Sequence, residues 1–335
     1  MGVSLSLKYR PTEFSDVCGQ LPVTMILEKQ LEKNQFVNCY LFSGPTGTGK
    51  TSIARILANK INKGLGTPLE IDAASNNGVD NIRLLIEQAG LRAIDSEYKV
   101  YIIDECHMLT NQSWNALLKL IEEPPKYTIF IFCTTELQKV PETIQNRCQR
   151  YKLSRISNDL IYNRLKQICI EEKIKNTKEA LVHITKVSMG SMRQAISYLD
   201  KCKDFGDITL DNVLSVLGNF SYDTFFELIN AIIDKNNSKV ISLIEDLYNH
   251  GDDLKLFIDL FLEFVLDLTK YIIFNSMEII KIPAEYKSKI EYTINVEEAS
   301  KYYNHLIDKI LELKQLIKND SMAKTTIEIF LISRI

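Results

Sequence analysis

The strongest chemical signal in the chain is an eight-residue stretch, 44–51, that matches the pattern GxxxxGK[ST]. It follows a short apolar run at 39–42 and opens a helical pattern at 52–62, which is the context that a phosphate-binding loop requires. Its glycines allow successive backbone N–H groups to turn inward around phosphates, and the helix N-terminus adds partial positive charge. Lys50 would reach the terminal phosphates of ATP, and the Thr51 hydroxyl would hold Mg²⁺. The predicted ATP-binding residues of this loop are Gly44, Pro45, Thr46, Gly47, Thr48, Gly49, Lys50, Thr51 and Ser52.

A second signal is a hydrophobic run at 100–103 that ends in two carboxylates, Asp104 and Glu105. Beside a phosphate-binding loop, we expect Asp104 to steer the Mg²⁺ shell and Glu105 to polarise the attacking water. The next apolar run, 128–133, ends in Thr134 and Thr135. A hydroxyl there would touch the γ-phosphate or orient the water, although a pair of threonines that caps a strand is an equally ordinary feature.

Two arginines are candidates for stabilising charge in the transition state. Arg147 could be supplied to the ATP of a neighbouring subunit, and Arg193, at the start of a helical pattern, could reach the γ-phosphate from a helical domain. A lone arginine is usually a solvated surface charge, so spacing alone does not assign these roles. We read His107 as a structural or coupling residue and Trp114 as a packing residue, and we treat Cys106 and Cys148 as small hydrophobes.

The elements that position these residues alternate in type along the first half of the chain. The apolar, β-like runs at 39–42, 100–103 and 128–133 are separated by helical patterns at 52–62, 79–93 and 114–121. Strands that alternate with helices predict an α/β fold with a parallel sheet covered on both faces. From about residue 157 the patterns are helical throughout, with Gly190 separating two helices.

Composition narrows the class of protein further. The 335 residues carry a net charge of −3, so any nucleic-acid contact must come from a local patch. Seven cysteines without a CxxC spacing, and no leader segment, predict reduced thiols in a cytoplasmic protein. The most apolar stretch, 254–274, has Asp259, Glu263 and Asp267 on one helical face, so we expect an amphipathic helix packed against protein.

Several segments resemble one family. Residues 7–11 (LKYRP), with 14–20, look like the opening of clamp-loader ATPases, and residues 72–80 (DAASNNGVD) resemble the bacterial gamma/tau subunit of DNA polymerase III. Residues 104–109, 115–125 and 190–193 carry the same resemblance. It implies an α/β AAA+ P-loop ATPase domain at 1–153, a small helical lid domain at 154–218 and an all-α collar domain for oligomerisation at 219–335.

The resemblance also implies roles for single residues. Tyr9, Arg10, Pro11 and Val17 would border adenine and ribose. Thr135 and Arg193 would be the first and second sensors, and Arg147 the finger that acts on the adjacent subunit's ATP. DNA would lie inside a spiral of subunits, with its phosphates met near Asn76, Asn77 and Ser113.

Three departures from the family pattern stand out. Residues 59–68 pass directly into 69–71 where the bacterial family usually carries a four-cysteine zinc module, so we predict no zinc site. Asn146 replaces the serine that usually precedes the arginine, and the sequence ends at Ile335 without the long tail of tau-type subunits. We expect a phage-encoded or otherwise reduced form.

The function implied is an ATPase motor of a DNA sliding-clamp loader, which opens the clamp on binding ATP, places it on primer-template DNA and releases it on hydrolysis. Its partners would be other clamp-loader subunits in a ring or spiral, expected to be pentameric, together with the clamp, DNA and, indirectly, the polymerase. The alternatives are another AAA+ DNA motor, such as a branch-migration ATPase, a structural clamp-loader subunit with weak ATPase activity, and an interaction scaffold.

Overall fold

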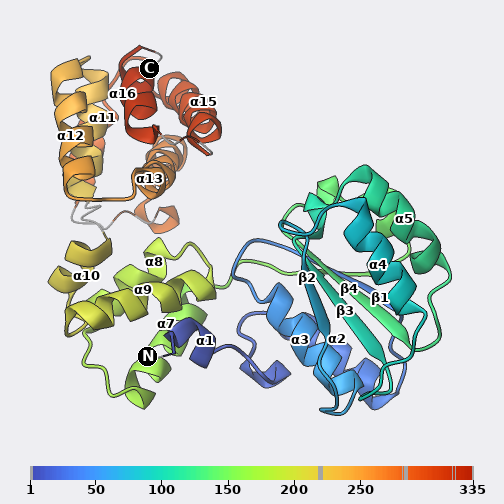
Figure 1. Ribbon diagram of the computed structural model, residues 1–335. Helices are drawn as coiled ribbons and strands as arrows, with labels where there is room; N and C mark the ends of the chain where they lie inside the picture. The colour runs from blue at the N-terminus through green and yellow to red at the C-terminus, as the bar shows by residue number, and fades with distance from the viewer. Residues whose placement is uncertain are drawn as a thin grey trace. The chain divides into compact units, whose positions relative to one another are not determined.

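The computed structural model of the protein describes residues 3–217, 222–280, 282, 286–318, 320 and 322–333. The chain forms two compact units, Met1–Thr209 and Leu210–Ile335 (Figure 1). The first contains a sheet and helices, and the second is helical in its described residues. The three-domain division expected from the sequence stays a prediction, and its boundary between 218 and 219 lies outside the described residues.

The centre of the first unit is a sheet of five parallel strands in the order β2-β3-β4-β1-β5. The strands are β1 (Cys39–Ser43), β2 (Leu69–Asp72), β3 (Lys99–Asp104), β4 (Thr128–Thr134) and β5 (Gln149–Lys152). Every residue of β1 and β4 is buried, which explains why these strands read as unbroken apolar runs. The sheet confirms the predicted α/β fold, although the two edge strands, β2 and β5, were not expected.

Helices cover both faces of the sheet (Figure 1). On one face, α2 (Leu21–Glu32) and α3 (Lys50–Ile61) share a core with alternate residues of the strands, such as Tyr40 and Phe42. On the other face, the core contains the intervening strand residues and the helices α4, α5 and α6. These are α4 (Val79–Ala89), α5 (Asn111–Glu122) and α6 (Glu142–Gln145). The period-two alternation of β1 therefore divides its side chains between two hydrophobic cores.

Two of these helices differ from their predicted bounds. Helix α4 ends at Ala89 rather than 93, where Gly90, a residue of low helix propensity, is the C-cap. Helix α5 begins at Asn111 rather than 114, because the Thr110 hydroxyl accepts a hydrogen bond from the Ser113 N–H as an N-cap. It ends before Pro124, as predicted.

The first unit also contains a helical group that follows the sheet in sequence. It consists of α7 (Asn158–Glu171), α8 (Lys178–Val187) and α9 (Met192–Phe205), with Gly190 between the last two as expected. The short α1 (Leu5–Lys8) is attached to this group, since the Leu5 N–H donates to the Asp200 carboxylate at 3.0 Å. The remaining short elements are η1 (Phe14–Asp16), η2 (Cys106–Met108) and η3 (Leu137–Lys139).

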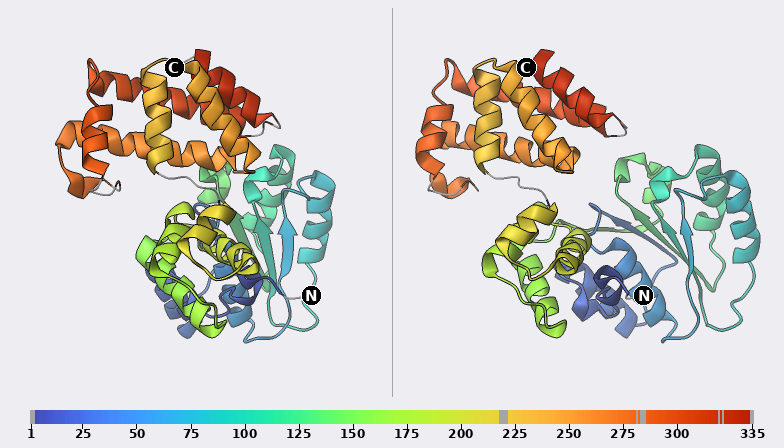
Figure 2. Two further views of the ribbon diagram at one scale, coloured as in Figure 1. Left: turned by 90° about the vertical axis from the view of Figure 1, so that its left-hand side faces the viewer. Right: turned by 60° about the vertical axis from the view of Figure 1, so that its left-hand side comes forward.

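The second unit is built around the long helix α13 (Leu254–Phe274), whose bounds match the predicted stretch (Figure 2). Its hydrophobic side chains join a core with those of the neighbouring helices. Asp267 is buried rather than solvent-facing, and its carboxylate is paired with Lys270 at 2.7 Å. The other helices are α10 (Leu210–Leu217), α11 (Tyr222–Ile233), α12 (Asn237–Asn249), η4 (Met277–Ile279), α14 (Lys287–Thr293), α15 (Ala299–Ile317) and α16 (Ala323–Ser333).

Candidate functional site

The predicted phosphate-binding loop joins β1 to α3 and is folded tightly against its neighbours. Gly44 has a φ of 150°, and a Cβ at this position would lie 2.3 Å from the Leu153 carbonyl oxygen. Gly47 has a φ of 74°, and a Cβ there would lie 2.0 Å from Ser191 Oγ. Both positions therefore require glycine for space as well as for conformation. Helix α3 begins at Lys50, so the loop delivers its lysine at the first turn of the helix.

The side chain of Lys50 is buried beneath this loop, with 6% of the residue exposed. Its ammonium donates to the carbonyl oxygens of Gly44 at 2.9 Å and Pro45 at 3.0 Å. Burial lowers the pKa of Lys50, while the nearby carboxylates of Glu105 and Asp104 act in the opposite direction. The loop thus holds a cation against its own backbone, in reach of any anion that enters.

Thr51 and Asp104, the two residues predicted to hold Mg²⁺, are in direct contact. The Thr51 hydroxyl donates to Asp104 Oδ2 at 2.8 Å, although 53 positions separate the two residues. The other oxygen, Asp104 Oδ1, accepts the backbone N–H of Glu105 at 3.0 Å. A hydroxyl and a carboxylate at one point are the hard oxygen ligands that Mg²⁺ prefers, so these residues fit the ion.

Glu105 follows the end of β3 in an unusual conformation. Its φ of 46° and ψ of 42° are left-handed, which is uncommon for a residue with a side chain and is typical of functional sites. Its Oε2 accepts a hydrogen bond from the Thr135 hydroxyl at 3.1 Å. Thr135, which we expected at the γ-phosphate or the water, therefore contacts the carboxylate expected to act on that water.

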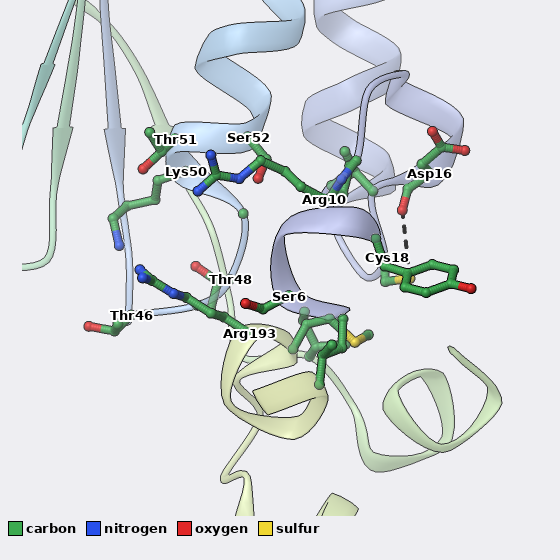
Figure 3. Close-up of a pocket in the computed structure, with 18 of the residues that line it drawn as sticks. Ser6, Arg10, Asp16, Cys18, Thr46, Thr48, Lys50, Thr51, Ser52 and Arg193 are labelled. Atoms are coloured by element: carbon green, nitrogen blue, oxygen red, sulfur yellow. Dashed lines mark hydrogen bonds between the residues drawn. The ribbon is translucent and has the colours of Figure 1, made fainter. Parts of the chain in front are cut away.

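The N-terminal segment lines the same pocket as the loop (Figure 3). The predicted residues that line it are Tyr9, Arg10, Pro11, Val17, Thr46, Gly47, Thr48, Gly49, Lys50, Thr51, Ser52, Asp104, Glu105 and Arg193. Tyr9 donates its hydroxyl hydrogen to the Glu172 carboxylate, and burial raises the pKa of Tyr9. Motifs from the two ends of the first unit thus meet in one cavity.

Cationic side chains surround this cavity. Lys50, Arg10 and Arg193 all line it (Figure 3). Burial lowers the pKa of Arg10, and the neighbouring guanidinium groups of Arg55 and Arg193 lower it further. Like charges held this close favour an anionic ligand between them, which is what a polyphosphate supplies.

Arg193 is brought to the pocket by a backbone contact between the loop and helix α9. The Met192 N–H donates to the Gly47 carbonyl oxygen at 3.1 Å, directly beside the Ser191 N-cap of that helix. The start of α9 is therefore joined to the tip of the phosphate-binding loop. This contact places Arg193, a residue of the helical group, at the nucleotide pocket.

Some lining residues were not anticipated from the sequence. Asp16, Cys18, Ile156, Arg164, Met192 and Ile196 complete the wall, together with Ser6 and Leu7. Arg164 lies on α7, with its guanidinium carbon 5.8 Å from the centre of the Tyr9 ring. Arg164 belongs to none of the motifs read from the sequence, so no sequence signal pointed to it, and its contact with Tyr9 arises from the packing of α7.

Arg147 is not among the residues that line this pocket. Its guanidinium pairs with Glu122 at 2.5 Å and donates to the Thr143 carbonyl oxygen at 2.7 Å. The side chain is 38% exposed, so it lies on the surface of the first unit. Its action on a neighbouring subunit stays a prediction.

The DNA contact expected near Asn76, Asn77 and Ser113 stays a prediction, but the Ser113 side chain itself is not available for it. Ser113 is fully buried, and its hydroxyl donates to the Asn77 carbonyl oxygen at 2.7 Å because it belongs to the N-terminal turn of α5. Its hydroxyl is thus committed to the protein. Asn77 is exposed and Asn76 is partly exposed, so both remain candidates for phosphate contact.

The described part of the chain has neither a metal-binding cluster nor a membrane-spanning helix. No group of three or more His, Cys, Asp or Glu residues there is arranged to hold a metal ion. None of the helices in that part is both long and apolar enough to cross a membrane. Trp114 packs against Phe132 in the core, as expected, with ring centroids 5.6 Å apart.

The fold resembles that of a solved structure. The RuvB Holliday junction branch migration motor of Thermotoga maritima matches 67% of this chain and 79% of its own, with a TM-score of 0.53 and 20% sequence identity. At that identity the likeness concerns the fold alone.

Sequence comparisons identify the family. Residues 208–332 match a family model described as DNA polymerase III subunits gamma and tau domain III, and residues 69–157 match one described as DNA polymerase III, delta subunit. The chain is 36% identical to DNA polymerase III subunit gamma/tau of Mycoplasma genitalium, over 91% of this chain and 54% of that protein. It is 38% identical to subunit tau of Bacillus subtilis, over 78% and 51%.

The chain therefore spans about half the length of these two relatives. DNA polymerase III subunit gamma of Buchnera aphidicola is 34% identical over 74% of this chain, and the match covers 75% of that shorter protein. All three relatives are gamma, tau or gamma/tau subunits of DNA polymerase III. The chain belongs to the DNA polymerase III gamma/tau family.

Proposed function

We propose that this chain is an ATPase motor subunit of a DNA sliding-clamp loader. ATP binding opens the clamp and places it on primer-template DNA, and hydrolysis releases it. One observation carries the proposal: a single pocket contains groups needed to bind and hydrolyse ATP. They are the buried Lys50, the Thr51–Asp104 pair, Glu105, Arg164 of α7 and Arg193 of α9. Membership of the gamma/tau family supports the choice of clamp loading over other uses of ATP.

Nucleotide binding follows from the charges of the pocket. In this structure, the Lys50 ammonium donates to the carbonyl oxygens of Gly44 and Pro45. When ATP binds, its phosphate oxygens replace these carbonyl oxygens as the acceptors. Arg193 adds a second positive charge from α9, and the N-terminus of α3 adds its partial charge. Tyr9 and Val17 provide the wall for the adenine and ribose.

Magnesium would be held by the Thr51 hydroxyl and the Asp104 carboxylate. When bound, the ion would supply positive charge that neutralises the charge developing on the phosphates. Asp104 has a second task in the protein, because its other oxygen fixes the backbone N–H of Glu105. The residue that holds the ion therefore also orients the residue that acts on water.

Hydrolysis needs a water molecule polarised by Glu105 and, in our proposal, Arg147 from an adjacent subunit. The pocket of one chain has no contribution from its own Arg147. We therefore propose a ring or spiral of subunits in which each site is completed by the neighbouring chain. The resemblance to clamp loaders implies five members, which would work with the clamp, primed DNA and the polymerase in the bacterial cytoplasm. An isolated chain should hydrolyse ATP slowly.

The test is the ATPase rate of the chain assembled with its partner subunits. Clamp and primed DNA together should stimulate it, and Lys50→Ala or Glu105→Gln should remove most of the stimulated rate and leave a small residual rate. Lys33→Ala and Glu87→Gln, at exposed positions of the first unit, are matched controls. Stimulation by four-way junctions without a clamp would indicate a branch-migration motor. A rate that Lys50→Ala leaves unchanged, in a complex that still assembles, would indicate a structural subunit.

A further inference from the structure

The side chain of His107 lies between two carboxylates beside the proposed catalytic centre. Its Nδ1 is 3.4 Å from Glu105 Oε2, and its Nε2 is 3.5 Å from Glu136 Oε1. Its Nδ1 is also 3.2 Å from Thr134 Oγ1, which is hydrogen-bond distance. The imidazole is only 8% exposed, so this arrangement is packed in place and is not a surface encounter.

Glu105 needs such a support. It stands in the left-handed region after β3, and its side chain is 34% exposed, so its rotatable bonds alone do not fix the carboxylate. Two neighbours reach the same oxygen, Oε2: the Thr135 hydroxyl at 3.1 Å and the His107 imidazole at 3.4 Å. A group that must polarise water gains most when it is held in one orientation.

The other side of the imidazole is anchored to the segment after β4. The Glu136 backbone N–H donates to Thr134 Oγ1 at 3.0 Å, so the Glu136 backbone and the His107 ring meet at one hydroxyl. The Glu136 carboxylate also accepts from Lys139 of η3 at 2.9 Å. The ring therefore rests on a segment that is itself held in place.

We infer that His107 is a positioning residue that holds the Glu105 carboxylate and links it to Glu136 at the end of β4. This inference rests on the proposed ATPase function and adds to it a residue that touches neither nucleotide nor water. The imidazole suits the task because its two nitrogens face opposite directions and meet different carboxylates. A side chain with one polar end cannot make both contacts.

The two contacts can be separated by substitution. The amide of asparagine reaches the place of Nδ1, toward Glu105, whereas the longer glutamine reaches that of Nε2, toward Glu136. In the assembled complex we expect His107→Ala to lower kcat by about 10- to 100-fold, the range for a misplaced catalytic group. The dissociation constant for ATP, measured without turnover, should stay within about twofold because the ring does not line the nucleotide pocket.

His107→Asn should recover most of the lost kcat, and His107→Gln should not. His305→Asn, on an exposed position of α15, is the matched control and should behave as wild type. A purely structural role would instead lower ATP affinity or thermal stability together with kcat, and asparagine and glutamine would be equally poor. Equal kcat values for His107→Asn and His107→Gln would therefore overturn the inference.

A double-mutant comparison tests whether His107 acts through Glu105. In a Glu105→Gln background, His107→Ala should lower the residual rate by less than about twofold, since residues that act as a unit are not additive. Two results would refute the inference. One is that His107→Ala lowers the rate by the same factor in the wild-type and Glu105→Gln backgrounds, and the other is a kcat for His107→Ala within about twofold of wild type. Failure of the proposed function would show differently, as a wild-type rate that Lys50→Ala leaves unchanged.

Discussion

Replacing Gly47 with alanine should strain the contact between the phosphate-binding loop and helix α9. The new Cβ would lie 2.0 Å from Ser191 Oγ and 3.0 Å from Ser191 Cβ, which is closer than atoms pack. The backbone at Gly47 also has a φ of 74°, a region that residues with side chains rarely adopt. One added methyl group therefore meets both a steric and a conformational obstacle.

The magnitude follows from these two obstacles. Holding alanine in the left-handed region costs about 1 kcal/mol. Moving Ser191 aside forfeits the N-cap of α9, where its Oγ accepts from the Gln194 N–H at 3.3 Å, and a lost cap costs about 1 kcal/mol. We expect Gly47→Ala to lower the free energy of unfolding of the first unit by about 2 kcal/mol. Affinity for ATP should fall too, because Arg193 is carried by the displaced helix.

The assay is urea unfolding followed by tryptophan fluorescence, since the chain's one tryptophan, Trp114, is buried in the first unit. Ser191→Gly removes the obstructing atoms and should cost only about 0.3 kcal/mol, because glycine is tolerated as an N-cap. The double variant Gly47→Ala/Ser191→Gly should then show a favourable coupling of about 1 kcal/mol.

Two results would refute this reasoning. One is an unfolding free energy for Gly47→Ala within about 0.5 kcal/mol of wild type, the range of a neutral surface change. The other is a double variant whose loss equals the sum of the single losses, since the obstruction by Ser191 would then not be the cause.

Three further predictions concern other parts of the first unit. Burial lowers the pKa of His183 to about 4 from 6.5, so between these pH values only the unfolded chain binds the proton. The free energy of unfolding should thus fall by roughly 3 kcal/mol from pH 6.5 to pH 4. In urea titrations at several pH values, His183→Leu should make the free energy of unfolding depend less on pH. The same pH dependence in this variant as in wild type would contradict the prediction. Arg147→Ala should lower turnover of the assembled complex at least about tenfold. It should change the free energy of unfolding by less than about 1 kcal/mol, because the Arg147–Glu122 pair is exposed. Glu122→Gln breaks the same pair and should retain turnover. Thr51→Val should raise the Mg²⁺ concentration for half-maximal hydrolysis by about tenfold and Thr51→Ser should not; equal Mg²⁺ curves would argue against the hydroxyl as a ligand.

The central strands could be read from the sequence, and the edge strands could not. Strands β1 and β4 are buried on both faces, so selection for apolar residues leaves a continuous run. Strands β2 and β5 have only four residues each and carry exposed charged side chains. Each has one strand neighbour instead of two, and its identity depends on the sheet it joins.

The site divides in a similar way. Lys50, Thr51 and Asp104 were predictable because phosphate and Mg²⁺ chemistry dictates both residue type and spacing. Arg164 and Ile156 reach the pocket only through the packing of the helical group, for which no local pattern exists. The burial of Ser113 could not be foreseen, since a hydroxyl at a helix N-terminus can bond to the protein's own backbone as well as to a phosphate.

The strand order also determines when the sheet can form during synthesis. Strand β1 leaves the ribosome first, yet it lies between β4 and β5 in the sheet. Cys39 can therefore pair only after Phe130 has been synthesised, and Tyr40 can pair with β5 only after Gln149 has been synthesised. Until about residue 134 has emerged, the apolar side chains of β1 have no strand beside them, and the second neighbour, β5, is complete only at about residue 152. Such distant pairing is slow. The nascent phosphate-binding loop is therefore expected to stay unformed through much of translation and to depend on chaperones that shield apolar segments.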